Sequence, residues 1–507
     1  MTITNYNGKK NHWERFFYVA FLILYFLGLL FLANYIYIWE DEAYSLNTSS
    51  HSLYKVIGLS YNFEAQPPFY FALLFLWRLI NSSIFFARLL SMIFIGLSAF
   101  YFDRLVSLII GKGKSFWVVI VFLLNPFTVW AGLEIRLYAL IILLSVILIY
   151  FYFKYFLSDN NKYLYIFLPF SLIALYTQYF FALLIFALAV TLWIFKGYKA
   201  FIKFCLYLIP VALLFLPNFK FVPGQISMSQ THLSDNIILK TIYSVLRTPQ
   251  NFVLALETIP ADRTIRWIIK ILFLIILIFA FFKLFIRQNS LNSVKKLFKI
   301  LFTIISIIFL LYLILVPSLR LIYQDKYMLI VFPLLMMVLS IFVISTPLNR
   351  NLIFGLLSIY FISILIWKYQ YPEKTYDFKS VATFLSKIQL DKEPILFYGK
   401  SILPPFEYYY SSKNKLYALP KLIYDKDYYE EKIKDTAEFN NEIMAIPSPT
   451  NSYLLVTESI VGFKYKQAMS REMIQNSIRN RYIISLDTIF NSKNSNNFLR
   501  LERLEKR

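Results

Sequence analysis

Charged side chains are scarce in this chain. Of its 507 residues only 16% are Asp, Glu, Lys or Arg, whereas 59% are hydrophobic and 20% are aromatic. A soluble protein of this size rarely combines so few charges with so many apolar residues. The composition therefore argues against a soluble globular protein.

Cysteine is nearly absent, and nucleotide-binding motifs are missing. Cys205 is the only cysteine and lies inside an apolar run, which excludes a disulfide within one chain and a cysteine metal cluster. No Gly-rich loop of the dinucleotide-binding kind occurs. Repeats and low-complexity linkers are not evident, and nothing suggests the inverted repeat of many transporters.

Long apolar runs dominate what is present. Several approach the roughly 20 residues needed to cross a bilayer core of about 30 Å, and they are solid runs, not the alternating ten-residue strands of a membrane barrel. We therefore predict an all-α polytopic membrane domain. The runs cover residues 16–38, 84–103, 116–131, 137–153, 179–195, 201–217, 266–282, 300–317, 327–346 and 352–367.

Basic residues give the chain a net charge of +22 and cluster in short connections between the apolar runs. There they set topology, so we expect membrane lipids and no nucleic acid as partners. Lys9, Lys10 and Arg15 precede the first run with no small-residue cleavage site after it, which predicts an uncleaved signal anchor and a cytoplasmic N-terminus. The other connections expected inside are 104–114, 196–203, 283–299 and the one at Arg350.

With this orientation, segment 67–103 must cross the membrane an odd number of times. Its first part, 67–80, begins with Pro67-Pro68 and is short for a span, so we predict a juxtamembrane or re-entrant helix there. Residues 1–369 then form a domain of about 11 spans, or up to 13. Its long outer loops are 39–83 and 218–265.

From residue 370 to 507 the composition becomes mixed and polar. Strand-like runs ("PILFYG", "SYLLVT", "RYIISL") alternate with helix-like ones ("FKSVATFLSKI", "KQAMSREMIQNSI"). This pattern predicts a small α/β domain, which the topology places outside the cytoplasm.

Three carboxylates follow the first apolar run directly, in the stretch "IWEDEAYS". One acid there would simply mark the water boundary. Three together, on the side where acids do not set topology, favour a functional role for Glu40, Asp41 and Glu42.

Two further segments at the outer ends of apolar runs carry polar residues. Glu64 and Gln66 stand before the Pro pair, and Glu134 is followed by Arg136 and Tyr138. A local ion pair between Glu134 and Arg136 is an alternative explanation for the second segment.

The order and separation of these segments resemble the membrane glycosyltransferases of the GT-C fold. The closest likeness is to glycosyltransferase family 39, which includes protein O-mannosyltransferases, and to the related aminoarabinose transferases that modify lipid A. The likeness covers most of residues 15–390, including "YDFKSVATFL". The matching segments are Asp41-Glu42, Gln66-Pro67-Pro68, the "YTQYF" stretch from Tyr176 to Phe180, and Lys326-Tyr327.

The resemblance implies an enzyme that transfers a hexose or pentose from a polyprenyl phosphate to a hydroxyl group on a lipid, glycan or protein, with inversion. It assigns the general base to Asp41, with Glu42 orienting the acceptor or Asp41. Like charges at an apolar interface would raise the pKa of Asp41. The other substrate-binding residues it suggests are Glu64, Gln66, Glu134, Arg136, Tyr138, Gln178, Arg320, Lys326 and Tyr327.

The leaving phosphate needs cationic partners. Lys326 has the best family support, and headgroup snorkelling is the alternative for Arg320. Arg88 is expected near the inner end of its span and so outside the site. The remaining candidates are Arg136, Arg247 and Arg263.

Two departures from the family pattern bear on metal binding: Gln66 stands where relatives have His or Lys, and Gln178 where they have His. We therefore predict that no cofactor is required. Oxygen ligands for Mg²⁺ or Mn²⁺ would come from Asp41, Glu64 and Glu134, and His232 is a further residue that could take the missing imidazole's place.

Two other functions fit parts of the sequence. A lipid or glycan transporter or flippase would carry ionisable residues mid-span, whereas the charges here gather at the ends of the runs. A receptor or scaffold would leave Asp41 dispensable. Abundant Ile, Lys, Asn and Phe suggest an A/T-rich bacterial genome and so favour a bacterial inner membrane over an endoplasmic reticulum. We expect a multi-pass protein with its site on the periplasmic or extracellular side.

Overall fold

The computed structural model divides into two compact units, each considered by itself. The membrane unit comprises Met1–Asn34 and Ala65–Lys368, and the sheet unit comprises Tyr35–Glu64 and Tyr369–Arg507. Apart from a few isolated positions, the described residues are 12–111, 115–229, 237–258, 264–272, 292–319, 325–345, 349–388, 390–399, 401–419, 435–459, 471–495 and 497–507.

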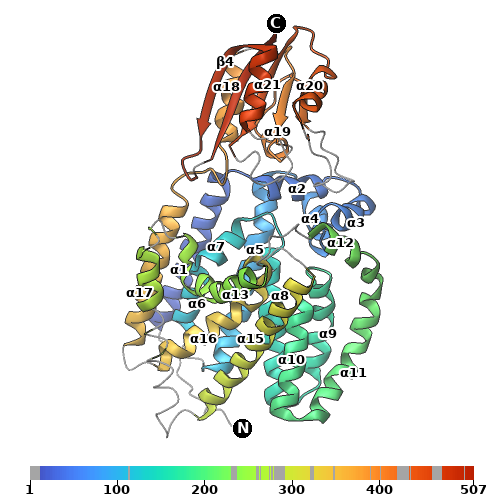
Figure 1. Ribbon diagram of the computed structural model, residues 1–507. Coiled ribbons are helices and arrows are strands. Elements are labelled where there is room, and N and C mark those ends of the chain that lie inside the picture. The colour runs from blue at the N-terminus through green and yellow to red at the C-terminus, as the bar shows by residue number, and fades with distance from the viewer. Residues whose placement is uncertain are drawn as a thin grey trace. The chain divides into compact units, whose positions relative to one another are not determined.

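The membrane unit is built from helices (Figure 1). Its elements are α1 (His12–Tyr35), α4 (Phe69–Arg78), α5 (Ile84–Ile109), α6 (Ser115–Leu124), α7 (Pro126–Leu133), α8 (Tyr138–Ser158), α9 (Lys162–Leu175), α10 (Phe181–Lys196), α11 (Tyr198–Phe215), η2 (Leu216–Lys220), α12 (Val222–Ser229), α13 (Ile237–Leu254), η3 (Leu256–Thr258), α15 (Asn292–Ser318), η4 (Asp325–Val331), α16 (Phe332–Ser345) and α17 (Arg350–Lys368).

The described residues contain seven helices long and apolar enough to cross a membrane, or eight if α6 and α7 form one bent span. Three shorter apolar helices, α4, α9 and α10, accompany them. The chain is therefore a multi-pass membrane protein. About half of the predicted run 266–282 lies outside the described residues, so the expected total of 11 to 13 spans stays a prediction.

The predicted run 116–131 is interrupted by a bend of 58° between α6 and α7. At the break, the Asn125 side chain accepts a hydrogen bond from the Phe127 amide at 2.9 Å, and Pro126 occupies the first turn of α7. An N-cap asparagine followed by proline begins a new helix, because proline has no amide to continue the previous one.

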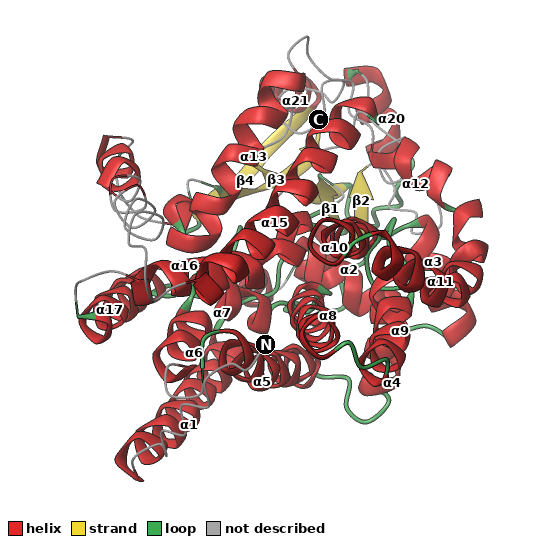
Figure 2. Ribbon diagram, turned by 90° about the horizontal axis from the view of Figure 1, so that it is seen from below, coloured by secondary structure: helices red, strands yellow, loops and turns green. Residues whose placement is uncertain are grey.

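Helix α8 lies at the centre of the membrane unit, among α5, α9 and α10 (Figure 2). In α8, 83% of the most apolar window is buried, against 17% in α1 and in α11. Large apolar side chains such as Phe16 and Leu24 are exposed on α1. In a membrane protein such side chains face the lipid, so their exposure costs no free energy.

The sheet unit contains a five-stranded sheet in the order β2-β1-β3-β5-β4. Strand β1 is parallel to β2 and β3, whereas β5 is antiparallel to β3 and β4. The predicted small α/β domain is confirmed. The elements are α2 (Glu40–Thr48), α3 (Leu53–Asn62), α18 (Phe378–Ile388), β1 (Ile395–Tyr398), α19 (Leu403–Glu407), β2 (Leu416–Leu419), α20 (Thr436–Met444), β3 (Ser452–Glu458), α21 (Arg471–Arg481), β4 (Tyr482–Asn491) and β5 (Phe498–Lys506).

Alternation along β1 explains why the sheet is covered on both faces. Ile395 and Phe397 join one apolar cluster, with α18 and α19. Leu396 and Tyr398 join the other, with α20 and α21. A strand buried on both faces is a continuous apolar run, as in "ILFY", whereas the edge strand β4 alternates between more and less buried positions.

Residues 35–64 follow the first membrane helix but pack with the C-terminal residues. The Tyr37 amide donates to the Pro372 carbonyl at 2.8 Å, and the Ile38 amide donates to the Tyr409 hydroxyl at 2.7 Å. The rings of Tyr37 and Tyr409 lie 5.4 Å apart. Part of the predicted first outer loop, 39–83, therefore belongs to the same compact unit as the tail.

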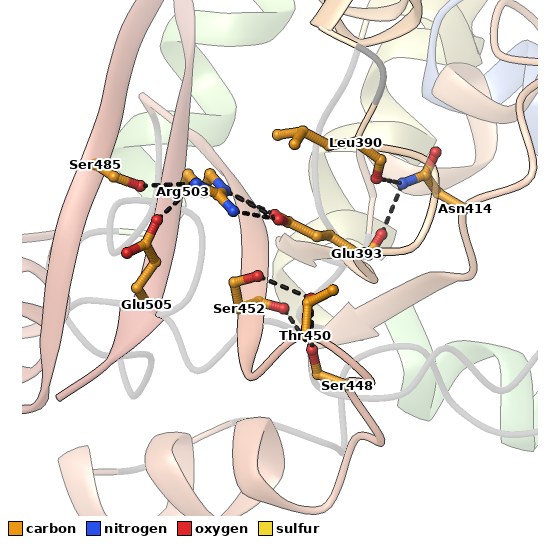
Figure 3. Close-up of polar contacts among 9 residues, drawn as sticks. All are labelled: Leu390, Glu393, Asn414, Ser448, Thr450, Ser452, Ser485, Arg503 and Glu505. Atoms are coloured by element: carbon orange, nitrogen blue, oxygen red, sulfur yellow. Dashed lines mark hydrogen bonds and ion pairs between the residues drawn. The ribbon is translucent and has the colours of Figure 1, made fainter.

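Ion pairs tie the strands of the sheet unit to its loops (Figure 3). Arg503 on β5 donates to both oxygens of Glu393 through Nε, each at 3.0 Å, and to Glu505 through Nη1 at 2.6 Å. The Asn414 side chain donates to the Glu393 and Leu390 carbonyls, each at 2.7 Å. The loop before β1 is thus fixed to both the sheet and the loop before β2.

Candidate functional site

The three carboxylates of the acidic segment occupy the first turn of α2. Trp39, in extended conformation, precedes them and provides no side-chain cap. Acidic residues are favoured at a helix N-terminus because the exposed amides carry partial positive charge. This local effect explains why the sequence tolerates three adjacent acids there. It does not distinguish their roles.

Glu42 forms a buried ion pair. Its side chain is fully buried, and its Oε2 accepts a hydrogen bond at 2.7 Å from Nζ of Lys374, which is 16% exposed. The partners are 332 residues apart in sequence. Because α2 is anchored in this way, Glu42 has a structural function in the sheet unit, whatever it contributes to a substrate.

Asp41 and Glu64 lie toward opposite ends of α2. Asp41 is half-buried, and its carbonyl accepts from the Ser45 hydroxyl at 3.1 Å. Glu64 accepts from the hydroxyl of Thr48, the last residue of α2, at 3.1 Å. Thr48 follows Asp41 by seven positions, which is about 10 Å along the helix axis. Only Asp41 shares the first turn with Glu40 and Glu42.

In the membrane unit, the predicted Glu-x-Arg-x-Tyr turn joins α7 to α8 and is buried. Glu134 and Arg136 are 1% and 6% exposed. The Glu134 carbonyl accepts from Ser91 of α5 at 2.6 Å, and the Arg136 guanidinium lies 5.9 Å from the centre of the Phe71 ring of α4. The turn therefore lies where α4, α5, α7 and α8 meet.

Lys326 reaches this turn. Its Nζ is 5.9 Å from the ring centre of Tyr138, the first residue of α8, and 5.9 Å from that of Tyr327. The Tyr138 ring also stacks on Trp130 of α7, with centroids 4.5 Å apart. The structure thus brings together two motifs that lie almost 190 residues apart in the chain.

Asp325 fixes the segment that carries Lys326. Its two carboxylate oxygens accept from the Thr248 hydroxyl and the Asn251 amide of α13, each at 2.7 Å. Arg247 on the same helix is 3.7 Å away. Arg247 is therefore an ion-pair partner of Asp325. Sequence reasoning missed Asp325, although a carboxylate beside a proposed phosphate ligand was visible in "YQDKY".

The "YTQYF" turn between α9 and α10 joins the same region. Phe180 stacks on Tyr327 with ring centroids 5.8 Å apart. The Tyr176 carbonyl accepts at 3.0 Å from the amide of Phe69, the residue after Pro67-Pro68. Gln178 is 4% exposed, and its Oε1 is buried with no hydrogen-bond partner among the described residues.

The residue before Gln66 has unusual backbone geometry. Ala65 adopts φ = 51°, a left-handed conformation that costs a non-glycine residue about 1–2 kcal/mol. Gln66 itself is half-buried. Strained backbone tends to gather at functional sites, which fits the candidate role of this segment.

The expectation that Arg88 lies near the inner end of its span is wrong. Arg88 is the fifth residue of α5 and is fully buried, and its Nη1 donates to the Ala33 carbonyl near the end of α1 at 2.7 Å. The end of α1 and the start of α5 are the ends joined by the predicted outer loop. Arg88 therefore lies at the end of α5 that the predicted topology places outside, one turn from Ser91, which donates a hydrogen bond to the Glu134 carbonyl.

Three candidate residues, Arg320, Arg263 and His232, lie outside the described residues. Within the described part of the chain, no three His, Cys, Asp or Glu side chains are grouped so as to hold a metal ion. The dispensability of metal stays a prediction.

These features describe a polytopic helical membrane unit and a small α/β unit. Among solved structures, the chain is similar to ArnT from Cupriavidus metallidurans in the apo state, with a TM-score of 0.50 and 10% identity over 95% of this chain and 97% of that one. The structure of the same protein bound to undecaprenyl phosphate matches with a TM-score of 0.42, at the same identity and coverage. No protein-family model and no curated protein sequence matches the chain.

The likeness to the apo structure confirms the predicted fold. It agrees with the resemblance drawn from the Asp41-Glu42, Gln66-Pro67-Pro68 and Lys326-Tyr327 segments. At 10% identity it concerns the fold alone, so the activity must be argued from the residues.

Proposed function

We propose that this protein is a membrane glycosyltransferase that moves a sugar from a polyprenyl phosphate to an acceptor hydroxyl, with inversion. The observation that carries the proposal is the convergence of separate motifs in the membrane unit. Lys326 lies against Tyr138, Tyr327 stacks on Phe180, and the amide of Phe69 bonds the turn that Phe180 ends. Helix packing could bring any residue types together at this point. The residues found here are instead the types expected for transfer of a sugar from a phosphate.

The cations of this region suit an anionic leaving group. In the reaction, the acceptor oxygen attacks the anomeric carbon while the bond from that carbon to the phosphate oxygen breaks, so the phosphate gains negative charge. Lys326 would hold that charge as a point cation, and Arg136 would offer planar, two-pronged donation. Such preorganised charges often supply the largest share of catalysis.

Asp41 is the proposed base, which takes the proton that the acceptor hydroxyl loses. It lies at the start of α2, half-buried, between Glu40 and Glu42. Glu42 forms an ion pair with Lys374, so Glu42 is less suited than Asp41 to act as the general base. We place the reaction at the outer face of a bacterial inner membrane, with Glu64, Gln66, Glu134 and Gln178 contributing to substrate binding.

Charge placement disfavours the transporter alternative. The buried charged residues described in the membrane unit are Arg88, Glu134 and Arg136. Arg88 lies in the second turn of α5, and the other two lie in the connection between α7 and α8. A transport pathway would place ionisable residues at mid-span.

The test compares surface glycans of a strain that lacks this protein, complemented with the wild type or with Asp41→Asn. Mass spectrometry should show one sugar increment restored by the wild type, which also identifies the sugar and the acceptor. Asp41→Asn should reduce transfer by about 10²–10⁴-fold, the usual contribution of a general base, at equal membrane abundance. A fully active Asp41→Asn would end the enzyme assignment.

A further inference from the structure

A small open cavity lies in the sheet unit between α2 and α19. Its lining residues are Ala43 and Asn47 of α2, Pro404 and Glu407 of α19, and Tyr408, which follows α19. Its volume is about 100 Å³. That is room for roughly 7–10 water-sized groups. We propose that this cavity binds a neutral sugar ring of the acceptor, so that the acceptor of the proposed glycosyl transfer is itself a glycan.

The polar atoms of the cavity define what it can bind. The Nδ2 of Asn47 is buried with no hydrogen-bond partner among the described residues. Glu407 likewise forms no hydrogen bond or ion pair with a described residue, and partial burial raises the pKa of its carboxyl. Two residues that line the cavity therefore carry one donor and one acceptor that the described residues leave unused.

A hydroxyl-rich neutral ligand satisfies both groups, because a hydroxyl both donates and accepts. A phosphate would be repelled by the Glu407 carboxylate. An ammonium group could not accept the hydrogen bond that Asn47 donates. Tyr408, 39% exposed, and Pro404 add an apolar wall for a ring face. An apolar wall with a few placed polar groups is the usual make-up of a small-molecule site.

The position of the cavity in the fold is also that of a ligand site. Helix α19 follows β1, so it begins beyond the carboxyl end of that strand. At the neighbouring strand end, Glu458 of β3 accepts from the Tyr376 hydroxyl, and the charge of Glu40 acts on the same tyrosine. Helix α2 therefore lies at the carboxyl edge of the parallel strands, where α/β folds bind ligands.

The distance from the proposed base assigns the cavity to the acceptor. Ala43 and Asn47 are one turn apart on α2, and Asn47 follows Asp41 by six residues, about 9 Å along the helix axis. A ring held by Asn47 would not carry the reacting hydroxyl. It would instead be a second ring that positions an acceptor of more than one sugar.

The test measures binding, not turnover. Purified full-length protein in detergent is mixed with methyl glucoside, methyl galactoside, N-acetylglucosamine and maltotriose, and saturation transfer from protein to sugar is recorded by NMR. Asn47→Ala removes a donor that has no partner among the described residues, so its melting temperature should be unchanged or higher. The sugar signal should fall at least fivefold in Asn47→Ala and in Tyr408→Ala.

Asn441→Ala is the matched control, because Asn441 is an exposed residue of α20 away from the cavity. The inference is overturned if no sugar gives a signal with the wild type, or if Asn47→Ala binds as well as Asn441→Ala. Binding that depends on Asn47 in a protein without transferase activity would keep the cavity assignment and end the proposed function. Sugar transfer by a protein that shows no Asn47-dependent binding would keep the proposed function and end the cavity assignment.

Discussion

Cations in the two units of this protein are held by two kinds of neighbour, carboxylates and aromatic rings. In the sheet unit, cations pair with carboxylates: Arg503 with Glu393, Arg500 with Asp487, and Lys374 with Glu42. In the membrane unit, Lys196 also pairs with Asp159, and several cations contact aromatic rings, including Lys326 on Tyr138 and Arg136 on Phe71. The chain has 51 basic but only 29 acidic residues and 99 Phe, Tyr and Trp residues, so rings are the available neighbours.

This difference separates two functions of charge. A carboxylate neutralises the cation it binds, and a buried pair of that kind fixes geometry more than it adds stability. A ring face carries no net charge, so it holds a cation in place without cancelling it. The first arrangement suits a scaffold and the second suits recognition of an anion such as a phosphate.

The largest effect on this comparison should come from breaking the Glu42–Lys374 pair. Glu42→Gln or Lys374→Met removes this ion pair from one side only, and the loss of one partner of a buried pair costs about 3–5 kcal/mol. The double variant removes both charges and should recover most of the loss. Thermal unfolding of the detergent-purified protein, followed by size-exclusion chromatography, measures all three.

The matched control is the ion pair of Lys196 and Asp159, also 2.7 Å long, whose side chains are 25% and 69% exposed. Lys196→Met should cost no more than about 1 kcal/mol, because water screens exposed pairs. A double variant at Glu42 and Lys374 that is as unstable as the singles would contradict the scaffold role.

The second prediction concerns Lys326. Lys326→Gln should lower the rate of sugar transfer by about 10²–10³-fold, the range seen when one stabilising group of a transition state is removed, while the protein stays folded. Lys326→Arg should retain part of the activity, since the charge is kept but its geometry differs. Lys299→Gln, at an exposed position of α15, should transfer at the wild-type rate. Equal rates for the variants at 326 and 299 would remove Lys326 from the site.

Sequence patterns were sufficient for several elements of the sheet unit. "FKSVATFLSKI" is α18 (Phe378–Ile388), and "PILFYG", "SYLLVT" and "RYIISL" contain β1, β3 and the start of β4. These segments succeed because apolar periodicity and flanking turns act over a few residues. The bend at Asn125-Pro126 could also have been predicted, since that dipeptide is a turn signal.

Long-range partners could not be predicted in the same way. Nothing local in "EDEAYS" shows that Glu42 will bind Lys374, 332 residues later, or that residues 35–64 will pack with the tail. Arg88 is a different kind of failure. An arginine in an apolar run is itself a signal of function or burial, but its position was assigned from the wrong end of the span.

A smaller effect is expected at Asp325, which acts through its neighbour. Asp325→Asn keeps the shape but weakens the bonds from Thr248 and Asn251, so Lys326 should be held less well and transfer should fall about tenfold. Misplacement by 1 Å can cost more than this. The double variant with Lys326→Gln should be no slower than Lys326→Gln alone, because coupled residues are not additive. Two fully additive losses would show that Asp325 acts independently of Lys326.

The smallest effect tests a buried carboxyl of the sheet unit, that of Glu373. It is 5% exposed, and its Oε2 has no hydrogen-bond partner among the described residues. Burial raises the pKa of its carboxyl above 4.5; the charge of Asp377 adds to this, while Lys493 and a backbone hydrogen bond oppose it.

A carboxyl with a raised pKa in the folded state favours folding when protonated and disfavours it when ionised. Glu373→Gln should therefore raise the melting temperature at pH 7 by about 1–3 °C. The gain should shrink as the pH falls through the folded pKa and vanish below the unfolded pKa, where the wild type is protonated in both states. Asp391→Asn offers the control, because the Asp391 carboxylate already accepts a hydrogen bond from Ser412 at 2.9 Å near the surface. A gain at position 373 that does not change with pH would show that charge is not its cause.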